Sequence, residues 1–67
     1  MNKQELYDEI NESQLRIDGY REDLITRLGK AIKNNDRAEL DNIYKLSLEL
    51  KSIQSALNTL KDKAKSL

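Results

Sequence analysis

Four carboxylates near the start of the chain have a spacing that could form a catalytic or metal-binding site, and no other residues of the sequence come closer to one. Glu5 and Glu9 lie one helical turn apart, and so do Asp8 and Glu12. Such pairs can bind a hard cation or divide the acid and base roles of a reaction. Here they fall in the first turns of an expected helix, where acidic side chains complement the positive end of the helix dipole. We therefore interpret the pairs as structural and predict no metal site.

The rest of the composition narrows the possible chemistry further. The chain has no Cys and no His, so it lacks a thiol nucleophile, the commonest general base and the ligands of most zinc sites. The basic residues near Tyr7, Tyr20 and Tyr44 form no pattern that suggests an activated phenol. The sequence also has no glycine-rich phosphate loop and no nucleophile elbow. We therefore expect a protein that is not an enzyme and has no cofactor.

Charge and hydropathy bear on the partners and the compartment. Twelve basic and twelve acidic side chains give a formal net charge of zero, which argues against nucleic acid or an anionic lipid surface as the partner. No apolar run approaches the length of a signal-peptide core or a membrane span. Because there is no Cys, nothing ties the chain to an oxidising compartment. We expect a cytoplasmic protein.

An apolar strip in the C-terminal half organises the chain. Its members recur at alternating steps of three and four, the pattern of a helix that packs at a small angle against another helix. We call such a strip a seam. The seam of this half comprises Ile43, Leu46, Leu50, Ile53, Leu57 and Leu60, followed by Ala64 and Leu67. A seam needs a partner helix, which the N-terminal half can supply.

The N-terminal half carries a similar seam. Its members include Ile10, Ile17 and Leu24. Gly19 weakens the case for one continuous helix, since it costs roughly 1 kcal/mol relative to Ala and Asp18-Gly19 is a common turn pair. However, Tyr20 and the seam residues on both sides keep helical phase across the glycine, so we predict one helix over about 2–33. The alternative is a three-helix bundle with a break at Asp18-Gly19.

Asn34-Asn35-Asp36 is the clearest break in the helical pattern. Asn tolerates the left-handed conformation that ends helices, and Asp36 precedes Glu39 by three residues, a spacing close to the capping box. We therefore predict a turn at 34–36 and a second helix over about 37–66. Helices of matched length with so short a connection predict an all-α antiparallel hairpin. We expect one domain over residues 1–67 that forms a homodimer, with four helices in one bundle.

Five apolar side chains fall outside the seams and lie toward the turn. They are Ile25, Ile32, Leu40, Tyr44 and Leu48. A contiguous apolar patch on a protein surface is typical of an interface, whereas a single exposed Leu is ordinary. We predict that these residues bind a partner protein, a second copy of the chain, or both through one shared surface.

Basic side chains near the turn raise the question of an anionic partner. They are Arg27, Lys30, Lys33, Arg37 and Lys45. A solvated helix face explains them most simply, and an acidic protein surface or RNA is the alternative. An RNA-binding dimer would depend on Lys30, Lys33 and Arg37 and would bind less tightly as salt is raised. No aromatic residues are interleaved with the basic ones to stack on bases.

Two segments of the chain also carry a family resemblance. They are Tyr20-Arg21-Glu22-Asp23-Leu24-Ile25 and Lys45-Leu46-Ser47-Leu48-Glu49-Leu50, the second followed by Ile53. Together they look like the hairpin of the Spo0E-like aspartyl-phosphate phosphatases, small proteins that act on a phosphorylated response regulator. Ser47, Glu49 and Leu50 match the Ser-Gln-Glu-Leu-Asp signature of that family, while Leu48 replaces its Gln and Lys51 its Asp. The resemblance implies docking on a response regulator, with Ser47, Glu49 and Lys51 lining the contact, and loss of the acidic residue implies docking without dephosphorylation.

These features predict a small regulatory or adaptor protein that binds a partner protein through a helical surface. The alternatives are a response-regulator-binding hairpin or phosphatase, and an RNA-binding helical dimer. A purely structural coiled-coil subunit, which would assemble without a further ligand, is a third alternative.

Overall fold

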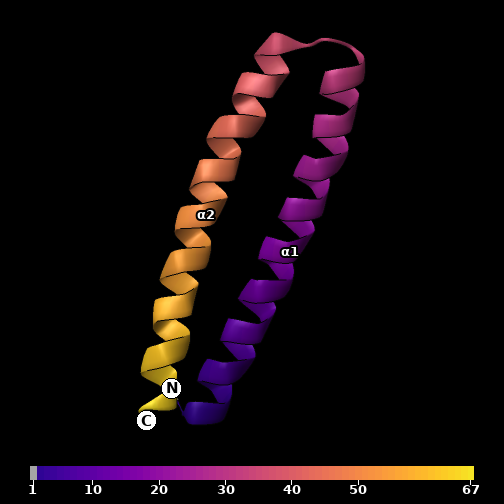
Figure 1. Ribbon diagram of the computed structural model, residues 1–67. Helices are drawn as coiled ribbons and strands as arrows, with labels where there is room; N and C mark the ends of the chain where they lie inside the picture. The colour runs from indigo at the N-terminus through magenta and orange to yellow at the C-terminus, as the bar shows by residue number, and fades with distance from the viewer. Residues whose placement is uncertain (1) are drawn as a thin grey trace.

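The computed structural model describes residues 2–67 and contains two helices joined by a short turn. Helix α1 spans Lys3–Lys33 and helix α2 spans Arg37–Lys65. They run antiparallel, so that both ends of the chain lie at the end opposite the turn (Figure 1). The described part of the chain contains no strand. The predicted all-α antiparallel hairpin is thus confirmed.

Helix α1 continues without interruption through Gly19. The backbone keeps φ negative there, and a Cβ added to Gly19 would meet no atom within 4 Å. Nothing in the hairpin therefore requires a glycine at this position. The alternative of a three-helix bundle broken at Asp18-Gly19 is wrong, because the inward-facing residues on both sides of Gly19 pack against the same neighbouring helix.

Asn35 and Asp36 build the reversal between the helices. Asn35 adopts the left-handed conformation, with a φ of 52°. The amide of Asp36 donates to the carbonyl of Ala31 at 2.9 Å and that of Asn35 to the carbonyl of Ile32 at 3.2 Å, the pair of bonds that forms a Schellman cap. The Asp36 carboxylate then accepts a 3.1 Å hydrogen bond from the amide of Glu39. The same short segment thus ends α1 and starts α2.

One column of side chains from each helix fills the contact between α1 and α2. Of the described residues, those buried are Ile10, Ile17, Ala31, Ile43, Leu57 and Ala64, and the half-buried Leu24 and Leu50 complete the columns. Within each column the residues recur every seven positions, close to two helical turns, and therefore share one face of their helix. These two columns are the core that holds the hairpin together.

Four residues of the predicted seam are exposed, and one of them, Leu67 at 71%, follows the end of α2. Leu46, Ile53 and Leu60 are 37%, 54% and 40% exposed. A seam with steps of three and four contains two columns, which lie about 60° apart around a helix of 3.6 residues per turn. In this hairpin α2 is rotated so that the column of Ile43 and Leu57 points at α1, and the other column lies at the edge of the contact. The placement of Leu46, Ile53 and Leu60 in the contact between α1 and α2 is therefore corrected.

Candidate protein-interaction surfaces

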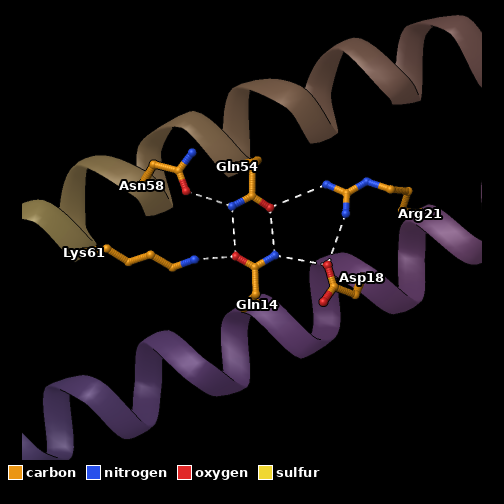
Figure 2. A network of polar contacts seen from close by, with 6 residues as sticks. All are labelled: Gln14, Asp18, Arg21, Gln54, Asn58 and Lys61. Atoms are coloured by element: carbon orange, nitrogen blue, oxygen red, sulfur yellow. Dashed lines mark hydrogen bonds and ion pairs between the residues drawn. The ribbon is translucent and has the colours of Figure 1, made fainter.

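Polar side chains hold the two helices together on one side of the core. The side-chain amides of Gln14 and Gln54 exchange hydrogen bonds of 2.8 and 2.9 Å across the two helices (Figure 2). Lys61 donates to the Gln14 oxygen at 2.7 Å, and Asp18 accepts from the Gln14 nitrogen at 3.1 Å. Arg21 bridges Asp18 and Gln54. Sliding one helix by a turn would separate the two amides, so this network selects the register of the hairpin.

The acidic residues near the start of α1 are engaged by their own helix. Asp8 accepts a 3.0 Å hydrogen bond from Gln4, and Glu12 forms a 3.0 Å ion pair with Arg16. Within residues 2–67, no group of three or more Asp, Glu, His or Cys side chains comes together in a way that could hold a metal ion. These two carboxylates thus pair with side chains of their own helix and add negative charge near its N-terminus.

The first of two exposed apolar surfaces lies beside the core columns. We call it the apolar face, and it consists of Tyr20, Leu46, Ile53 and Leu60. Tyr20, Leu46 and Ile53 line one groove between the helices, and Leu60 follows Ile53 by seven residues on the same side of α2. Tyr20 is 62% exposed. This surface was not predicted from the sequence, because the periodicity of α2 assigns Leu46, Ile53 and Leu60 to the core.

A bidentate ion pair lies at the end of the apolar face that is nearest the turn. Arg27, which lines the same groove, donates from Nη2 to Glu39 Oε1 at 2.7 Å and from Nε to Oε2 at 3.3 Å. The hydrogen bond to Glu39 and the charge of that carboxylate raise the pKa of Arg27 above its ordinary value. The pair links α1 to α2, and it offsets the charge of one basic residue near the turn.

The second surface is formed by the predicted partner-binding residues. We call Ile25, Ile32, Leu40, Tyr44 and Leu48 the turn-end patch. Leu40 is half-buried and the other four are exposed. Ile25 and Ile32 share a face of α1, whereas Leu40, Tyr44 and Leu48 form a ridge at four-residue steps along α2. This ridge turns gradually away from α1, which explains why Leu40 is the most buried.

The two surfaces lie on opposite sides of the hairpin. Ile25 lines a second groove together with Ser47 and Gln54, which directly follow Leu46 and Ile53 of the apolar face in the sequence. Consecutive helical residues point about 100° apart. Ser47 and Gln54 therefore lie on one side of the inward-facing column of α2, and Leu46 and Ile53 lie on its other side. Leu28, which sequence analysis did not assign to the patch, lines the second groove as well and extends the turn-end patch toward the core.

The residues that carry the family resemblance do not converge on one site. The Ser47 hydroxyl donates a 2.8 Å hydrogen bond to the Ile43 carbonyl of its own helix. Glu49 lines the groove of the apolar face, whereas Lys51 lines the groove on the other side. A single partner surface that touched one side of the hairpin would therefore meet Glu49 or Lys51, but not both.

Neither helix in the described part of the chain is long and apolar enough to cross a membrane. Comparison of the chain with protein families, with curated proteins and with solved structures gave no match.

Proposed function

We propose that the chain is a cytoplasmic regulatory or adaptor protein without enzymatic activity that forms a homodimer and binds a partner protein through the turn-end patch. The observation that carries partner binding is the exposure of Ile25, Ile32, Tyr44 and Leu48, each more than half accessible to solvent. Burying a large apolar side chain completely contributes roughly 1.5 to 3 kcal/mol. A surface that presents several such side chains near one end of the molecule supports protein binding.

The chemistry around the patch points to an amphipathic helix with acidic flanks as the partner. The apolar residues on α2 follow at four-residue steps, which suits packing against the apolar stripe of another helix. Lys33, Arg37 and Lys45 lie in the same part of the chain, and acidic side chains on the partner would complement them. Apolar contacts would supply most of the affinity, and the charges would supply orientation and association rate.

A matched pair of substitutions tests this function. Leu48→Asp places a charge in the turn-end patch, and Leu15→Asp makes the same change at another exposed position of the hairpin. In a pull-down from cells that encode the chain, the wild type and Leu15→Asp should retain the same protein, while Leu48→Asp and the double variant Tyr44→Asp/Leu48→Asp should lose it. Circular dichroism should show unchanged helicity, because all three side chains are exposed in the hairpin.

Two outcomes would contradict the proposal. Retention of the partner by the double variant would show that the turn-end patch is not the binding surface, and loss of helicity would show that Tyr44 and Leu48 belong to the core. Capture of RNA that weakens steeply with salt and depends on Lys30 and Lys33 would favour the RNA-binding alternative instead. Purified chain should meanwhile sediment as a dimer over a wide range of concentrations.

A further inference from the structure

We propose that the apolar face binds the apolar face of a second copy in an inverted orientation, so that the two turns lie at opposite ends of a four-helix bundle. This inference rests on the homodimer of the proposed function and adds which surface forms it and in which orientation. The turn-end patch lies on the other side of each hairpin and stays accessible in the dimer. Each dimer would then present two copies of the patch on its outer surfaces.

The shape of the hairpin leaves room for a second layer. Over residues 2–67 it consists of two helices that pack only against each other, so its secondary structure forms one layer. Stable domains normally bury their apolar surface between two packed layers. The hairpin has a single layer, and a second copy stacked on the apolar face would supply the other.

The accessible area supports a second copy as the occupant. The hairpin exposes 5409 Å², whereas a compact monomer of 7.8 kDa would expose about 4,400 Å². The excess of about 1,000 Å² is similar to the roughly 800 Å² that each partner buries in a stable interface. One further copy is therefore enough to bring the exposed area per chain to that of an ordinary folded domain.

Side-chain sizes along the face favour the inverted orientation. Tyr20 and Ile53 lie near its centre, with Ser13 and Arg27 seven residues to either side on α1. Inversion about the centre would place Arg27 opposite the small Ser13 of the second copy, and Leu46 near its Leu60. With both turns at the same end, the two Arg27 side chains would lie at one level along the bundle and the two Ser13 side chains at another. The inverted orientation thus avoids placing two long Arg27 side chains at one level of the bundle and two small Ser13 side chains at another.

Charges along the edge of the face favour the same orientation. Glu9, Arg16, Asp23 and Lys30 recur every seven residues on α1, and Asp23 lines the groove of the apolar face. Against an inverted copy, Glu9 would meet Lys30 and Arg16 would meet Asp23, so every contact along this edge pairs opposite charges. The ion pair of Arg16 with Glu12 is exposed and weak, and it does not prevent this exchange.

The opposite orientation would bring like charges together. Glu49 lines the same groove as Asp23, across it on α2. With both turns at the same end, α1 of one copy lies over α2 of the other, and Asp23 would face the Glu49 of the second copy. Such juxtaposed carboxylates disfavour an arrangement, and charges of this kind select orientation more than affinity.

A matched pair of Glu substitutions identifies the face. Ile53→Glu should weaken dimerisation by at least about a hundredfold, as expected for loss of a central apolar contact, whereas Ile25→Glu on the other side should leave it unchanged. Sedimentation over a wide range of concentrations measures both. Each residue is more than half exposed in the hairpin, so circular dichroism should show that both variants keep their helicity and that dissociation is not caused by unfolding.

Two further measurements identify the orientation. Because the chain has no Cys, Arg37→Cys gives one spin-label site beside the turn, and the distance between labels should approach the 49 Å length of the hairpin. With both turns at one end, the labels would lie within about 30 Å, the width of a few helices. Asp23→Arg should weaken the dimer roughly three- to tenfold through loss of two symmetric ion pairs, and adding Arg16→Asp should restore it.

The outcomes separate this inference from the proposed function. Dissociation by Ile25→Glu but not by Ile53→Glu would show that a dimer exists but forms through the turn-end patch, which overturns only the inference. A short distance between labels would likewise overturn the inverted orientation. A chain that stays monomeric at all concentrations would refute the homodimer itself, whereas the pull-down tests partner binding independently of either result.

Discussion

Replacing Ile17 by Val tests whether the core columns hold the hairpin together. Ile17 is only 4% exposed and packs in a cluster with Ile10, Leu57 and Ala64. The substitution removes one buried methylene group, whose burial contributes about 0.8 kcal/mol to stability. Ile-to-Val changes in protein cores cost about 0.5–1.5 kcal/mol in total. In a domain of this size about 1 kcal/mol corresponds to roughly 4–8 °C. We expect the melting temperature to fall by that amount.

The same substitution at two other positions provides the controls. Ile25→Val, at a position 63% exposed, should change the free energy of unfolding by less than about 0.5 kcal/mol, as is usual for surface sites. If the chain is a monomer, Ile53→Val should lose as little stability as Ile25→Val. If a second copy covers the apolar face, that variant should lose about as much as Ile17→Val. All three changes keep a β-branched residue in a helix, so their effects on helix propensity cancel.

Thermal and urea unfolding followed by circular dichroism, at matched protein concentrations, measures all three variants. An equal loss of stability for Ile17→Val and Ile25→Val would refute the assignment of Ile17 to the core. A larger loss for Ile25→Val than for Ile17→Val would mean that the helices are rotated about their axes relative to the structure described above.

Three further predictions concern the helices, the turn and the polar network. Gly19→Ala should raise the unfolding free energy by about 0.5–1 kcal/mol, because the added Cβ meets no atom within 4 Å; a lower melting temperature would show that another chain approaches α1 closely there. Asp36→Ala should cost about 1 kcal/mol through loss of the cap on Glu39, and Asp36→Ser should restore most of it in urea unfolding. Gln14→Leu and Gln54→Leu should show a coupling of about 0.5–1.5 kcal/mol in a double-mutant cycle, and additive effects would contradict the paired amides.

The helices and their antiparallel arrangement were predictable from the sequence because the deciding interactions are local. The left-handed Asn35 and the carboxylate of Asp36 act on backbone groups within a few residues of themselves. Continuity of α1 through Gly19 was also predictable, since the apolar residues on both sides keep helical phase. A turn this short leaves two long helices with little choice other than to pack side by side.

The division of the seam was not predictable in the same way. The column containing Leu50 and the column containing Leu46 and Ile53 have the same seven-residue period and the same apolar character. Which of them faces α1 depends on the rotation of α2 about its own axis. That rotation is decided by contacts between residues far apart in the chain, such as Gln14 with Gln54 and Ile17 with the cluster around Leu57.

The sequence by itself determined where each helix starts and stops, because caps and periodicity act over a few residues. It also identified the turn-end patch as a set of apolar residues outside the seam. Only the tertiary structure decided that the apolar face lies open on the opposite side. The physical reason is that contacts between residues far apart in the chain decide how α2 is rotated about its axis, and the pattern alone does not say which of two equivalent apolar columns that rotation buries.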